Sequence, residues 1–142
     1  MAIKPHKVQV AALSARGDNT GFAYFMEQGL GKTLTSYLDL QETVAERRAT
    51  RMLVVCPNSF KAGWVKDAEK HGLDYDYFVW KAGMHGYLRT WIRKRFTKPP
   101  VLIVNWEAIR ARKKKVGKKT VWESTELMDL IMEFANIVGG RA

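Results

Sequence analysis

The stretch GFAYFMEQGLGKTLTSYLDL, residues 21–40, decides the fold that this sequence predicts. It opens with an apolar run over 21–26 and continues through a short glycine-bearing loop. A pattern with apolar residues close to every 3.6 positions follows, and it predicts a helix over 33–48 that ends in two arginines. A strand, a loop and a helix in this order form the first unit of an α/β fold.

The rest of the chain repeats the alternation of short apolar runs and helical patterns. Strands are predicted over 52–56, 75–80 and 101–105, each apolar on both faces as in a sheet covered by helices. Helices are predicted over 59–71, with Ser59 as N-cap, and around Leu88, Trp91, Ile92 and Phe96. The basic run 113–119 is predicted to be a loop, and Thr120 and Glu123 a capping box that opens a last helix through Leu127, Leu130, Ile131 and Phe134. The expected fold is one α/β domain, 1–142, with a parallel sheet and flanking helices.

The loop between the first strand and helix has the chemistry of a phosphate site. Gly29 and Gly31 permit backbone conformations and close approaches that a Cβ would forbid, so successive N–H groups can point at phosphate oxygens. Lys32 adds a charge for the β- and γ-phosphates, and Thr33 offers a hydroxyl to Mg²⁺. The dipole of the following helix favours the same anion. The residues therefore predict that Gly29, Leu30, Gly31, Lys32 and Thr33 bind ATP with Mg²⁺.

Charge predicts a polyanionic partner. Lysine and arginine number 24 against 14 acidic residues, which gives a formal charge of +10. The excess is concentrated in 89–98 and 110–119, whereas 34–46 is net acidic, so we expect a basic face. Nucleic acid is the commonest partner of such a face, and a merely solvated surface is the alternative.

The segment 26–33 resembles motif I of Swi/Snf-type superfamily 2 helicases, whose pattern is DEMGLGKT. It matches that pattern at Glu27 and at each position of 29–33, although Met26 stands where a Walker A loop has glycine. The resemblance implies the first RecA-like lobe of a P-loop ATPase that translocates on double-stranded DNA. Near the start of the chain, Lys7 occupies the place of a glutamine that contacts adenine in that family, and Gln9 lies two residues later.

Two further stretches resemble motifs of the same family in the expected order. Residues 53–60 with Trp64 resemble motif Ia, which implies that Ser59 touches the DNA backbone, while Trp64 is expected in the core. Residues 101–109 resemble motif Ib, with Asn105 in a DNA-facing place. A rival interpretation makes this strand a degenerate Walker B that presents Glu107. The basic residues Lys113, Lys114 and Lys115 complete the predicted DNA surface.

The family's next strand should end in Asp-Glu-x-His, and its second lobe should supply arginine fingers. Neither is found in the sequence, so we expect no catalytic residues and an incomplete lobe, whose remainder lies on another chain or is missing. An alternative is a free-standing nucleic-acid-binding or regulatory protein that keeps the motor fold. A small P-loop kinase is disfavoured because no lid or Walker B carboxylate is visible.

The cysteine and histidine content and the hydropathy of the sequence bear on disulfides, zinc binding and cellular location. The one cysteine, Cys56, excludes an internal disulfide framework, and the three histidines lack ligand spacing for zinc. No apolar run suggests a signal peptide or membrane span, so an intracellular, cytoplasmic protein is expected.

Overall fold

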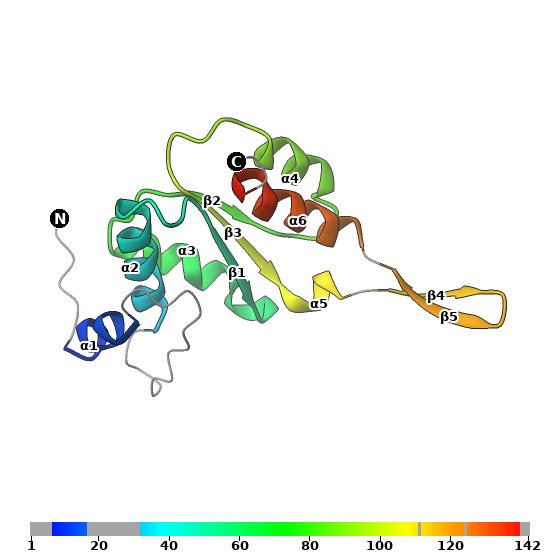
Figure 1. The fold of residues 1–142 in the computed structure, drawn as a ribbon, viewed down its shortest axis with the longest axis horizontal. Coiled ribbons are helices and arrows are strands. Elements are labelled where there is room, and N and C mark those ends of the chain that lie inside the picture. The colour runs from blue at the N-terminus through cyan, green and yellow to red at the C-terminus, as the bar shows by residue number, and fades with distance from the viewer. Residues whose placement is uncertain (1–6, 17–31, 111, 124, 140–142) are drawn as a thin grey trace.

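The computed structural model describes residues 7–16, 32–110, 112–123 and 125–139. Within them the chain forms a three-stranded parallel sheet with helices on both faces and a separate two-stranded hairpin (Figure 1). The elements are α1 (Lys7–Arg16), α2 (Lys32–Ala45), β1 (Met52–Cys56), a 3₁₀ turn η1 (Asn58–Phe60), α3 (Lys61–Lys70), β2 (Asp76–Val79), α4 (His85–Ile92), β3 (Pro100–Asn105), α5 (Trp106–Ile109), β4 (Arg112–Val116), β5 (Lys119–Glu123) and α6 (Glu126–Gly139).

The sheet has the order β1-β3-β2, so β3 pairs with a parallel neighbour on each side. The predicted strands 52–56, 75–80 and 101–105 are confirmed as β1, β2 and β3. The predicted strand 21–26 lies outside the described residues. An α/β fold with a parallel sheet and flanking helices is therefore present in the described part.

Two apolar clusters, one on each face, hold the layers together. One face packs Val101 and Ile103 against α2 and α3, where Tyr37 is fully buried and donates its hydroxyl to the carbonyl oxygen of Trp64 at 2.9 Å. Trp64 is part of this packing, as predicted. The other face packs Leu102 and Val104 against α4 and α6. Alternate residues of one strand thus enter opposite layers, as the two-residue period of a strand requires.

Among the described strands, β3 is buried on both faces, whereas β1 is covered on one face. Leu53 and Val55 of β1 are 40% and 44% exposed, whereas Val54 and Cys56 on the opposite face are buried. The prediction that every strand is buried on both faces is therefore wrong for β1. The reason is position: β1 lies at the edge of the described sheet, where α4 and α6 reach the central strand but leave these two side chains uncovered.

The basic run 113–119 is not a loop, contrary to prediction, because β4 and β5 pair through it as an antiparallel hairpin. Val116 pairs with Lys119, which leaves Gly117 and Lys118 as a two-residue turn. Gly117 has φ 63° while Lys118 is not among the residues with positive φ, the pattern of a type II′ turn. Charge density indicated a loop, but lysines fit a strand whose surroundings are solvent, and 119–123 includes strand-favouring residues.

Three predicted helix boundaries also change. Thr120 and Glu123 lie in β5, so they form no capping box; the start of α6 is capped instead by Thr125, whose Oγ1 accepts from the Met128 N–H at 3.1 Å. Ser59 is not an N-cap, because the chain first makes η1, and Phe60 occupies the N-cap position of α3 without a side-chain bond. Helix α2 ends at Ala45, before the two arginines, and Arg47 takes a left-handed φ of 61° in the turn that follows.

Candidate functional site

The carboxyl edge of the sheet is where the fold gathers polar side chains. Helix α3 leaves β1 over one face, whereas the segment after β3 leads to α6 on the other face. Connections that diverge in this way open a crevice between the ends of neighbouring parallel strands, which is the usual ligand position in α/β sheets. A pocket of about 340 Å³ occupies this place. Its lining residues are Asn58, Lys61, Trp80, Ala82, Asn105, Glu107 and Ala108.

A chain of hydrogen bonds crosses this pocket. Lys61 is only 8% exposed, and its Nζ donates to the carbonyl oxygen of Trp80 at 2.6 Å and to Asn105 Oδ1 at 3.0 Å. Asn105 Nδ2 in turn donates to Glu107 Oε2 at 2.8 Å. The bond from Asn105 holds the pKa of the Glu107 carboxyl below its usual value. The pocket therefore presents a buried ammonium and an ionised, exposed carboxylate linked by one amide.

Sequence reasoning missed Lys61, although the sequence contains a signal for it. Lys61, Trp64, Val65 and Ala68 are spaced by three and four residues, so they share one face of α3. That face packs on the sheet through Trp64, Val65 and Ala68. A lysine in line with an apolar stripe is expected either to extend its head to solvent or to find buried acceptors. Lys61 does the second.

The predicted phosphate site is only partly described. Gly29, Leu30 and Gly31 lie outside the described residues, and Lys32 is the first residue of α2. Thr33 is half-buried in the first turn. Since α2 returns to β1 through the short segment 46–51 and packs along the sheet, its N-terminus faces the carboxyl edge of β1. The start of α2 and the pocket around Lys61 thus belong to the same edge of the sheet.

The residues predicted to face DNA are not brought into one cluster. Ser59 is exposed in η1. Asn105 is at the end of β3, where both its amide oxygen and its amide nitrogen are engaged inside the molecule. Lys113, Lys114 and Lys115 lie in β4, and Figure 1 shows the hairpin extending away from the helices and the three-stranded sheet. Gln9, near the predicted adenine position, is 1% exposed in α1.

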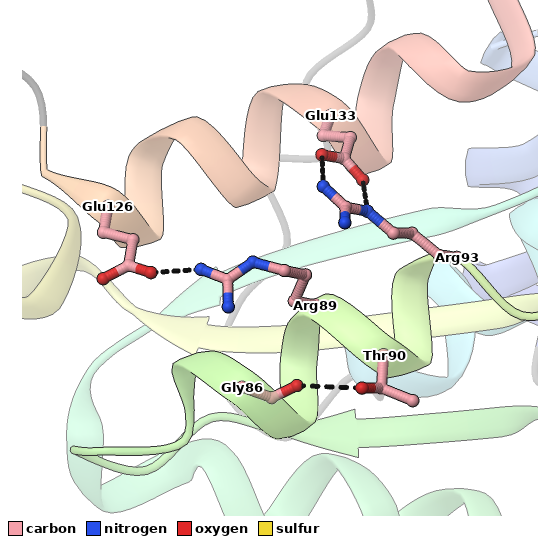
Figure 2. A network of polar contacts seen from close by, with 6 residues as sticks. All are labelled: Gly86, Arg89, Thr90, Arg93, Glu126 and Glu133. Atoms are coloured by element: carbon pink, nitrogen blue, oxygen red, sulfur yellow. Dashed lines mark hydrogen bonds and ion pairs between the residues drawn. The ribbon is translucent and has the colours of Figure 1, made fainter.

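The second basic stretch, 89–98, is largely neutralised within the fold. Figure 2 shows Arg89 paired with Glu126, and Arg93 paired with Glu133 through two bonds of 2.8 and 2.9 Å. Lys94 pairs with Asp76 at 2.5 Å and Lys98 with Asp74 at 2.8 Å. Four of the basic side chains in this stretch therefore bind acidic groups of α6 or of the segment at β2. The expected basic face is thus reduced on this side.

In the part of the chain that the structure describes, no group of three or more His, Cys, Asp or Glu side chains is placed to hold a metal ion. None of the described helices is long and apolar enough to cross a membrane. Comparison of the chain with protein-family models, with curated proteins and with solved structures gives no match.

Proposed function

We propose that this chain is a nucleotide-binding, RecA-like lobe of a DNA-dependent ATPase of the Swi/Snf helicase-like type. One observation carries the proposal: α2 begins at Lys32, directly after the Gly29-Leu30-Gly31 stretch, with its N-terminus at the carboxyl edge of a parallel sheet. A helix start in this position offers unpaired N–H groups and a positive dipole end to a phosphate. The sequence motif and the position of this helix both support a phosphate ligand.

The residue types at this helix start suit a phosphate group. Lys32 would reach the β- and γ-phosphates and Thr33 would offer its hydroxyl to Mg²⁺, while the glycines would let backbone N–H groups approach. Bound ATP would supply a phosphoryl group for transfer to water. Our proposal for this chain is limited to binding and orienting the nucleotide. Its catalytic residues are not assigned.

The proposed second ligand is double-stranded DNA, held through its phosphates. Exposed Ser59 and the basic hairpin would contact the backbone, which positions a duplex without reading its sequence. Asn105 would contribute chiefly by fixing the pocket, because its amide is already bonded to Lys61 and Glu107. The remaining lobe of the motor, on another chain, is a proposed partner.

A second candidate function is a nucleic-acid-binding or regulatory protein that uses the hairpin without nucleotide. The observation that favours it is the hairpin itself, which contributes an exposed basic surface that is independent of α2. The two candidates differ in how nucleotide affects DNA binding. In a motor lobe, bound nucleotide changes the affinity for DNA, whereas in the second candidate it does not.

Calorimetry with Mg²⁺-ATP and Mg²⁺-ADP tests the nucleotide site. We expect Lys32→Ala to weaken binding by about 1.5 to 3 kcal/mol, the usual worth of a charged hydrogen-bonded contact. Lys66→Ala is the matched control, because Lys66 is an exposed lysine in the middle of α3. Equal affinities of wild type and Lys32→Ala, or no binding at millimolar nucleotide, would contradict the phosphate site. Binding of duplex DNA that is insensitive to saturating nucleotide would favour the second candidate.

A further inference from the structure

The β4–β5 hairpin is an arm with few contacts to the rest of the protein. Among the described elements, its two strands contact each other extensively and neither has a comparable contact with any other element. Figure 1 shows the hairpin projecting beyond the start of α6. Residues 115–121 are all exposed, including Val116 and Val121 at 58% and 44%. A two-stranded ribbon without a covering layer is marginally stable in water, so a bound partner is expected to order it.

The arm carries the densest run of basic residues in the sequence. Positions 112–119 include six basic residues, and Glu123 is the one acidic residue between 112 and 123. The described side chains Lys115, Lys118 and Lys119 are exposed and take part in no ion pair within the described part of the chain. Arg89, Arg93, Lys94 and Lys98 differ because each has an acidic partner inside the fold. Of the two basic stretches, the hairpin is the one free to bind an external anion.

The shape of the arm selects the kind of anion. Each strand has five residues, or about 16 Å at roughly 3.3 Å per residue, and paired strands are about 4.8 Å apart. The major groove of B-form DNA is about 12 Å wide and about 8.5 Å deep, and it admits a two-stranded ribbon. The major groove of A-form, double-stranded RNA is deep and narrow, and side chains cannot read it. Lysines along the ribbon would meet phosphates on both walls of the groove.

We propose that the β4–β5 hairpin binds in the major groove of duplex DNA as a basic ribbon, whereas Arg89, Arg93, Lys94 and Lys98 stay paired with acidic groups inside the fold. The inference rests on the DNA half of the proposed function and is independent of the nucleotide site. Because the contacts are chiefly to phosphates, binding will depend strongly on salt and weakly on base sequence.

The charge of the arm is tested by titrating a labelled duplex of about 20 base pairs at several salt concentrations. In the triple variant Lys115→Gln, Lys118→Gln, Lys119→Gln, the slope of log K against log salt should become shallower by up to about 2.7, at about 0.9 per phosphate contact. The matched control neutralises Lys66, Lys70 and Lys81, exposed lysines of the body without an ion pair in the described part. An equal change of slope in both variants would mean that DNA is attracted by the overall charge and not by the hairpin. An unchanged slope in the hairpin variant would mean that these lysines do not contact DNA phosphates.

The shape of the arm is tested at Gly117 without any change of charge. Gly117 has φ 63°, and a Cβ there would meet no atom within 4 Å, so a substitution acts through the backbone alone. Valine is strained at positive φ, whereas asparagine tolerates it. We expect Gly117→Val to bind the duplex several-fold more weakly than wild type, and Gly117→Asn to bind as wild type does. If Gly117→Val binds the duplex as tightly as wild type and Gly117→Asn do, the ribbon conformation is not required for binding.

Duplex RNA of the same length separates groove binding from attraction to any polyanion. Binding should be weaker to the RNA than to the DNA duplex, and the triple lysine variant should lose less affinity for RNA than for DNA. Equal binding to both duplexes would overturn the groove assignment. A wild-type chain that binds no DNA at low salt would overturn the DNA half of the proposed function as well. If wild type binds DNA but no hairpin variant changes that binding, only the inference about the arm fails.

Discussion

Lys61 keeps a charged head in a place from which most of the solvent is excluded. An ammonium in such surroundings is costly unless acceptors surround it, and the carbonyl oxygen of Trp80 and the amide oxygen of Asn105 fill that role. Those two acceptors come from the ends of different strands. Lys61 therefore ties α3 to the carboxyl edge of the sheet, and it fixes the orientation of the Asn105 amide that reaches Glu107.

We expect Lys61→Met to destabilise the chain by about 1 to 3 kcal/mol, because one buried and one partly buried acceptor would lose their donor while the side chain keeps a similar length. Denaturant unfolding followed by circular dichroism measures the change. Lys66→Met, on an exposed position of the same helix, is the control and should lie within about 0.5 kcal/mol of wild type. Equal stability of the two variants would mean that the buried lysine is held without net benefit, as some buried charges are.

At the scale of elements, α4 and α6 are joined by an apolar contact and by ion pairs at its rim. Leu88 and Ile92 of α4 pack with Leu127, Leu130 and Phe134 of α6. Arg93 and Glu133 pair beside this contact, and the hydrogen bond from Arg93 lowers the pKa of Glu133. Both side chains are partly exposed, at 58% and 33%, so the pair adds little to the apolar contact at neutral pH.

Glu133→Gln should therefore destabilise the chain by less than about 1 kcal/mol at pH 7. The pKa of Glu133 is lower in the folded than in the unfolded chain, so its contribution is complete above the unfolded-state pKa of about 4.3. The contribution is lost as the pH falls through the lower folded-state pKa. Unfolding at pH 7 and at about pH 3 should thus show a difference from wild type that shrinks on acidification. Glu69→Gln, in α3 without a described ion pair, should show no such trend; a constant difference for Glu133→Gln would contradict the assignment.

The elements also show what sequence patterns can and cannot predict. The strand 52–56 was predicted with its observed bounds, because five apolar residues followed by Pro57 leave little freedom. The hairpin was not predicted, since its lysines carry no apolar period and only the Gly117-Lys118 turn marks it. The burial of Lys61 depends on acceptors from residues 19 and 44 positions away, which local patterns do not contain. Likewise, the ion pairs of 89–98 depend on acids brought close only by the fold.

At the scale of the whole molecule, the described chain presents two surfaces with different expected tasks. The carboxyl edge of the sheet holds the start of α2 and the pocket with Lys61 and Glu107, whereas the hairpin extends the chain away from the sheet. In the proposed motor lobe, nucleotide would bind at the edge and DNA along the arm and η1. Coupling between the two would have to pass through the segment after β3, because α5 joins the pocket residue Glu107 to the start of β4.

The described residues at the carboxyl edge of the sheet include some, but not all, of the groups that ATP hydrolysis requires. We expect the isolated chain to bind nucleotide without ATPase activity above background, with or without duplex DNA. Lys32 and Thr33 can hold phosphates and one side of Mg²⁺, but in-line attack also needs a metal-linked carboxylate, an oriented water and a cation on the leaving charge. The arginine finger alone contributes about 10³- to 10⁵-fold in rate. Glu107, in the first turn of α5, is the one carboxylate that lines the described pocket, and the hydrogen bond from Asn105 lowers its pKa.

Phosphate release should therefore be measured for wild type, Lys32→Ala and Glu107→Gln, each with and without DNA. Wild-type turnover that each of the two substitutions abolishes would contradict the prediction. It would assign Glu107 the role of the Walker B carboxylate. Glu69→Gln controls for the loss of one exposed carboxylate elsewhere. Turnover that arises only when a polypeptide carrying an Asp-Glu-x-His strand and a second lobe is added would support the motor lobe, because that polypeptide supplies the groups that phosphoryl transfer still requires.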